Sequence, residues 1–118
     1  MESFEFSSAV RGYHVYKDVW EPSVGEKLVA WREFDNQFDK FAVKLLNDEE
    51  TVGHLPREYS RITWYFLARG GSISVEVSGH RRRCKQLCGG MEIPCRVTFT
   101  CLRKAMLNQL KALLMKKV

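Results

Sequence analysis

The chain has 118 residues and a net charge of +5, and 45% of its residues are hydrophobic. This length suits one domain with a single core, and the apolar and aromatic content excludes a disordered chain. No stretch approaches the roughly 20 apolar residues that a membrane span needs, and no basic region followed by an apolar run marks a secretory signal. We therefore expect a nuclear or cytoplasmic protein, no membrane partner, and a polyanion as a partner.

The hydrophobic pattern predicts several short strands and two helices. Segments with strand-like alternation or apolar content are 4–10, 26–32, 41–46, 51–55, 72–78 and 93–101. The third and fourth of these flank an acidic turn and should form a hairpin. Apolar residues at helical spacing predict two helices. The first covers 57–69, follows Pro56 and stops at Gly70 and Gly71, and the second covers 102–118.

Short strands with one inserted helix favour a mainly β fold with two helices (α+β). The expected architecture is a small, partly open barrel of the oligonucleotide-binding type with about six strands. A twisted sheet with helices on one side is the alternative. We expect residues 1–101 to form the barrel and 102–118 to form a basic amphipathic helix. That helix would pack on the barrel or contact a protein partner through a stripe of Leu102, Met106, Leu110, Leu113 and Leu114.

The four cysteines all lie in the C-terminal third, at Cys84, Cys88, Cys95 and Cys101. Their spacing is wider than the close pairs of a structural zinc site. Without a secretory signal, reduced thiols are the expected state. We predict no metal and no other cofactor.

Catalytic motifs are missing from the sequence. It contains no nucleophile elbow, no phosphate-binding loop and no zinc-protease helix motif. Asp35 and Asp39 share one loop and could hold a divalent ion in a metal-dependent nuclease, but two loop carboxylates more often cap turns. We expect a protein that is not an enzyme, and the nuclease is the least favoured alternative.

A single-strand binder needs aromatic faces for bases and cations for phosphates. Candidate stacking residues are Tyr13, Tyr16, Trp20, Phe34 and Phe38. Candidate phosphate ligands are Arg32, Lys40, Arg57, Arg61 and the basic run of Arg81, Arg82, Arg83 and Lys85. Core packing is the alternative for each ring, and a solvated loop is the alternative for the basic run.

A carboxylate among these cations repels phosphate. It fits a nucleic acid only where phosphate is absent, as at a free 3′ hydroxyl. Asp39 could accept the proton of that hydroxyl, with Asn36 beside it. A turn-capping role for Asp39 is an equally good interpretation of the sequence.

Two segments at these positions together resemble a HIRAN domain. One has Asn36, Phe38, Asp39, Ala42 and Val43 in the spacing N-x-[FY]-D-x-x-A-[VI], and the other reads V-G-H-L from 52 to 55. The resemblance also includes Gly12, Tyr16, Glu26, Arg32 and Lys40, and it covers roughly Phe4 to Thr100.

The resemblance implies a modified oligonucleotide-binding barrel that binds single-stranded DNA and grips its 3′ end. It implies that Asn36, Phe38 and Asp39 belong to the end pocket. The basic residue and tyrosine pair of the family fall on His14, Val15 and Tyr16, and its V-G-H histidine falls on His54.

We therefore predict a non-catalytic DNA-binding domain. Tyr16 and Phe38 would stack on terminal bases, and Asn36 and Asp39 would hold the terminal hydroxyl. The predicted phosphate ligands are Arg32, Lys40, Arg57 and Arg61, while His54 would contact a phosphate or anchor the end of its strand. A protein-interaction module that has kept the scaffold and lost the pocket is the alternative.

Overall fold

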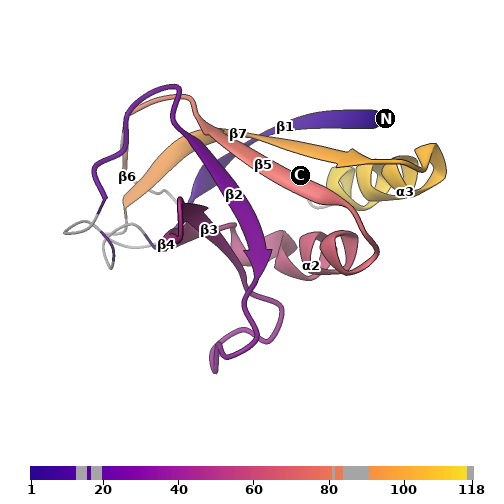
Figure 1. Cartoon of the computed structure of the whole chain (residues 1–118), viewed down its shortest axis with the longest axis horizontal. Coiled ribbons are helices and arrows are strands. Elements are labelled where there is room, and N and C mark those ends of the chain that lie inside the picture. Colours follow the sequence, from indigo (N-terminus) through magenta and orange to yellow (C-terminus); the bar gives the residue numbers. More distant parts are fainter. Residues whose placement is uncertain (13–15, 17–19, 81, 84–90, 117–118) are drawn as a thin grey trace.

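The computed structural model describes residues 1–12, 16, 20–80, 82–83 and 91–116. Its strands are β1 (Glu2–Val10), β2 (Lys27–Arg32), β3 (Val43–Asn47), β4 (Glu50–His54), β5 (Ser72–Val77), β6 (Arg82–Arg83) and β7 (Met91–Cys101). Its helical elements are a 3₁₀ turn η1 (Arg57–Tyr59), α2 (Ser60–Ala68) and α3 (Lys104–Met115). Figure 1 shows the strands wrapped over α2, with α3 at the end of β7.

The strands form one antiparallel sheet in the order β1-β7-β5-β2-β3-β4, and β6 pairs with the start of β7. The edge strands β1 and β4 meet at a single bridge. The Arg11 N–H donates to the His54 carbonyl at 2.8 Å, and the His54 N–H donates to the Arg11 carbonyl at 2.9 Å. The sheet therefore curls into a partly open barrel, which confirms the predicted fold class.

Arg11 strengthens this closure with its side chain. Its Nε lies 3.0 Å from a carboxylate oxygen of Glu92 on β7, and its Nη1 lies 3.3 Å from Glu58 in η1. Glu92 is buried, and a buried carboxylate needs such a partner to offset its lost hydration. The end of β1 is thus joined to β4, β7 and η1 at one place.

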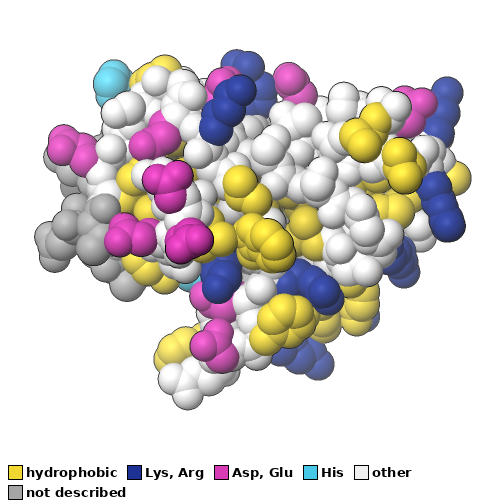
Figure 2. Space-filling view, in the orientation of Figure 1, with side chains coloured by type: hydrophobic (Ala, Val, Ile, Leu, Met, Phe, Trp, Pro, Cys, Tyr) yellow, Lys and Arg dark blue, Asp and Glu magenta, His cyan; other side chains and the backbone are white. Residues whose placement is uncertain are grey.

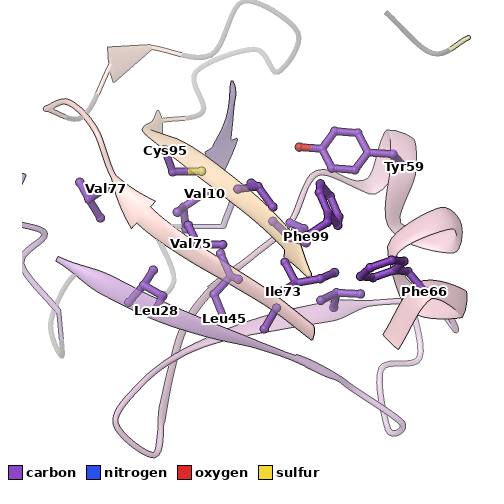
Figure 3. Packing of buried hydrophobic residues seen from close by; sticks show 14 of the residues in the cluster. Val10, Leu28, Leu45, Tyr59, Phe66, Ile73, Val75, Val77, Cys95 and Phe99 are labelled. Carbon is purple, nitrogen blue, oxygen red and sulfur yellow. The ribbon is translucent and has the colours of Figure 1, made fainter. Parts of the chain in front are cut away.

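The core fills the inside of the curled sheet (Figure 3). Alternate residues of β5 and β7 face inward, as expected for strands with one buried side: Ile73, Val75, Val77, Ile93, Cys95, Val97 and Phe99. The helices cover the open side of this core. Phe66 of α2 meets Phe99 edge-on, with ring centroids 5.5 Å apart, and α3 adds Leu107, Leu110 and Leu114.

The helices differ in detail from their predicted limits. The segment predicted as one helix over 57–69 begins as η1, and it ends where Gly70 adopts a positive φ of 95°. In α3, Leu102 precedes the helix and is 80% exposed, and Leu107 takes its place in the buried stripe. None of the described helices combines the length and the apolar character of a membrane span.

Two further features depart from the sequence prediction or extend it. Between the predicted strands 72–78 and 93–101, where no strand is expected from the sequence, the structure has the short strand β6 and the start of β7. Cys95 and Cys101 are buried free thiols, whereas Cys84 and Cys88 lie outside the described residues.

Candidate nucleic-acid interface

The turn between β2 and β3, residues 33–42, is built around the side chain of Asn36; we call it the Asn36 turn. The Asn36 Oδ1 accepts hydrogen bonds from the backbone N–H groups of Phe38 and Asp39, at 2.8 and 2.9 Å. The Asn36 Nδ2 donates to Glu33 Oε1 at 2.8 Å. An asparagine that bonds the backbone two and three residues ahead fixes the shape of a turn. Asn36 therefore sets the direction in which Phe38 leaves the chain.

Asp39 ties the Asn36 turn to the helices. One carboxylate oxygen accepts from the Phe41 N–H and the other from the Ser60 hydroxyl, both at 2.9 Å. Arg57 reaches back from η1 and donates to the Phe38 carbonyl at 2.8 Å. Asp39 thus caps the turn, and because each carboxylate oxygen has two lone pairs, it keeps capacity for a further donor.

Aromatic contacts hold the flanks of the turn on α2. The Phe34 ring meets Trp64 edge-on at 5.0 Å, and the Phe41 ring lies 5.6 Å from that of Tyr65. The Arg32 guanidinium lies 4.9 Å from the Phe34 ring centroid, within the range of a cation–π contact. Phe38 differs, because its ring projects from the turn and is 77% exposed.

The outward surface of β2, β3 and β4 adjoins the turn and carries a second group of exposed or partly exposed side chains. Trp31, Lys44 and His54 lie opposite one another across these strands, and Trp31 is 58% exposed. The Tyr16 ring lies 6.1 Å from that of His54. His54 Nε2 lies 2.9 Å from Glu33 Oε1, so Glu33 links this surface to the Asn36 turn. We call Tyr16, Trp31, Lys44 and His54 the outer face.

The ionised state of Glu33 is favoured by its surroundings. Burial of the carboxyl raises its pKa, but hydrogen bonds from Asn36 and His54, with the charges of His54 and Lys44, outweigh that effect. The pKa of Glu33 therefore lies below its ordinary value of 4.5. Nearby, burial and the negative charge of Glu33 raise the pKa of Tyr16, so its ring keeps a neutral hydroxyl.

We expect Glu33→Gln to weaken the acid sensitivity of the fold. The pKa of Glu33 is lower in the folded than in the unfolded chain, so its stabilisation is complete above pH 4.5 and is lost as the pH falls through the folded-state value. Urea unfolding at pH values from about 7 to about 3 measures this difference. The wild-type protein should lose more stability than Glu33→Gln over the acidic part of that range. An equal loss of unfolding free energy in both proteins would contradict the role given to Glu33.

Several predicted site residues lie together in the structure. Asn36, Phe38, Asp39 and Arg57 meet at the turn, and Tyr16 and His54 are neighbours on the outer face. Arg32 packs on Phe34, whereas Lys40 and Arg61 lie over the Phe41 ring, at 5.2 and 5.5 Å. His14, with Tyr13, Val15, Arg81 and Lys85, lies outside the described residues.

One aromatic candidate was wrong, and one was missed. Trp20 is 4% exposed and donates its indole N–H to Glu26 at 2.6 Å, so it is a core residue and offers no stacking face. Trp31 was overlooked although the strand alternation places it opposite the buried Leu28 and Ala30. Glu33 and Lys44 were also missed, since nothing in the sequence signals that Glu33 bonds His54 or that Lys44 lies opposite it.

Within the described ranges, no three or more His, Cys, Asp or Glu side chains are placed to share a metal ion. Asp39 uses its carboxylate for the turn and for Ser60.

The curled sheet and its bridge define a small barrel of the oligonucleotide-binding type. The family model of the HIRAN domain matches residues 2–99. The chain therefore belongs to the HIRAN family, whose members are DNA-binding domains rather than catalytic ones.

Solved structures share this fold. The crystal structure of the HIRAN domain of human HLTF is 21% identical, with a TM-score of 0.73 over 96% of this chain and 88% of that one. An NMR structure of the HLTF HIRAN domain is 17% identical, with a TM-score of 0.67 over 98% and 91%. A Lactobacillus plantarum protein is 16% identical, with a TM-score of 0.56 over 84% and 100%. No curated protein sequence matches the chain.

Proposed function

We propose that this chain binds single-stranded DNA at a free 3′ end and does not catalyse a reaction. The observation that carries the proposal is the Phe38 ring, which is 77% exposed and stands on a turn fixed by Asn36 and Asp39. An exposed ring beside hydrogen-bonding groups can stack on a base while those groups contact the sugar. Membership of the HIRAN family supports the same interpretation.

The terminal nucleotide lies at the Asn36 turn in this proposal. The Phe38 ring stacks on its base, and Asp39 accepts a hydrogen bond from its 3′ hydroxyl. The negative charge of Asp39 disfavours a phosphate at that position, so the carboxylate selects an unphosphorylated end. Asn36 acts mainly by holding the backbone of the turn, because both polar atoms of its side chain are bonded within it.

The rest of the strand crosses basic and aromatic surface on either side of the turn. Arg57 and Lys40 flank Phe38, with Arg61 and Arg32 on the α2 side, and they hold phosphates. Tyr16 and Trp31 offer further rings on the outer face, where His54 supplies a polar edge. Each stacked base contributes about 1–3 kcal/mol, which together with the phosphate contacts gives affinities of about 1 μM at low salt.

A salt titration tests this function. Fluorescence polarisation would follow a labelled single strand of about 15 nucleotides, which covers the site of one such barrel. We expect the logarithm of the affinity to fall linearly with the logarithm of salt concentration, by about 0.7 for each phosphate contact. Lys40→Gln should make that slope shallower.

Lys104→Gln is the matched control, since Lys104 is an exposed lysine at the start of α3, away from the turn. It should leave the slope unchanged. A blunt duplex should bind more weakly than the single strand. Equal binding of the duplex, or an affinity that does not change with salt concentration, would contradict the proposal.

A further inference from the structure

A groove of about 360 Å³ runs between α3 and the segment formed by η1 and α2. Its volume lies within the roughly 300–1,000 Å³ of ligand-binding pockets. The lining is mostly apolar and includes Ile62, Tyr65, Phe66, Met106, Leu110 and Leu113. Two of these side chains remain partly open to solvent, Tyr65 at 41% and Leu113 at 39%.

The margin of the groove is strongly basic. The cationic lining residues are Arg57, Arg61, Arg69 and Lys116. Glu58 is the carboxylate among the lining residues, and it is paired with Arg11 at 3.3 Å. In the view of Figure 2, many acidic side chains gather at the left, while basic ones lie along the right and lower margins and at the top.

We propose that this groove docks a short amphipathic helix of a partner protein, with apolar side chains on one face and Asp or Glu beside them. Helices with this pattern bind grooves through anchors at i, i+3 or i+4, and i+7. The apolar floor takes those anchors. The four cations complement acidic residues along the flanks of the helix and repel a basic segment.

The chemistry of the floor favours a peptide over a nucleic acid. Ile62, Met106, Leu110 and Leu113 are aliphatic or thioether side chains, and they offer no flat face for a base. The lining also has two rings: Phe66 is buried against Phe99, and Tyr65 packs against Phe41. A flexible methionine beside leucines adapts to varied apolar side chains of a protein. This binding does not depend on the proposed DNA function, although Arg57 and Arg61 belong to both sites.

A panel of labelled peptides tests the proposal. Each has about 15 residues, with Leu, Phe or Met at i, i+4 and i+7 and with Glu at the flanking positions. A matched set carries Lys in place of each Glu. By fluorescence polarisation on the full chain, we expect acidic peptides to bind at least about tenfold more tightly than their lysine counterparts.

Variants then locate the binding. Leu113→Gln changes an exposed part of the floor, and Arg69→Gln with Lys116→Gln removes two charges from the margin. Each of these two variants is expected to lower the affinity for the acidic peptide by about fivefold or more. The matched controls are Met115→Gln, on the same helix and 57% exposed, and Arg103→Gln with Lys104→Gln; none of these three residues lines the groove, and peptide affinity should not change.

Three results would overturn this assignment. One is that no acidic peptide of the panel binds, and another is that the lysine peptides bind equally well. The third is that Leu113→Gln weakens the binding of a single-stranded oligonucleotide and leaves peptide affinity unchanged. That result would make the groove part of the DNA site. Failure of DNA binding alone would leave the peptide result standing, so the two proposals are tested separately.

Discussion

Gly53→Ala is expected to lower the free energy of unfolding by about 3 kcal/mol or more, the upper range for overpacking a filled core. A Cβ atom at this position would overlap the Cγ1 atom of Val10 and would lie 2.9 Å from the Arg11 carbonyl oxygen. Both neighbours are at the end of β1, and Val10 is fully buried. Neither can move without opening the bridge between Arg11 and His54 that joins β1 to β4.

Gly25→Ala is the matched control for this substitution. A Cβ at Gly25 has no heavy atom within 4 Å, and its only obstacle is a positive φ of 92°. That strain costs about 1 kcal/mol. Urea unfolding of both variants separates steric overlap from the general loss of a glycine. Equal destabilisation of the two would show that the approach of β4 to β1 is not tight.

Phe38→Ala is expected to weaken binding of single-stranded DNA by about 10-fold, within the range for one stacked base. The ring is 77% exposed, so its removal should change the free energy of unfolding by no more than about 0.5 kcal/mol. A loss of affinity in a fully folded variant would therefore reflect a lost contact with the ligand. Polarisation titrations at one salt concentration measure it.

Phe34→Ala controls for the loss of an exposed ring on the same turn. Phe34 is 73% exposed, but its ring lies against Trp64 and beneath the Arg32 guanidinium. The Phe34 ring has less surface available for stacking than the Phe38 ring, so its removal should lower the affinity for single-stranded DNA less. If Phe34→Ala abolished binding and Phe38→Ala did not, the stacking role would belong to the α2 side of the turn.

The predicted strands and helices agree with the structure wherever a strong hydrophobic period marks them. The alternation of Ile73, Val75 and Val77 places β5 to within a residue, and Gly70 marks the end of α2. Short pairing has no such signal, and β6 has only Arg82 and Arg83 paired to β7. The bridge between Arg11 and His54 was equally hidden, since residues so far apart in sequence meet only when the sheet has curled.

The candidate site was predictable in outline because a turn of Asn, Phe and Asp has a clear chemical meaning. The hydrogen bonds that connect this turn to other segments were not predictable. The bonds from Asp39 to Ser60 and from Arg57 to the Phe38 carbonyl link segments that no local pattern relates. Trp20 shows the opposite error, because an aromatic residue outside the predicted strands can still be buried in the core, with its indole N–H bonded to Glu26.

The central claim is that Asp39 recognises an uncharged strand terminus. The most direct measurement compares the affinity of the wild-type chain for two labelled oligonucleotides that differ only in a 3′ hydroxyl or a 3′ phosphate. We expect the hydroxyl end to bind about tenfold more tightly. Asp39→Asn, which keeps an acceptor for the Phe41 N–H, should remove most of that preference. Equal affinity of the wild-type chain for the two ends would contradict the claim.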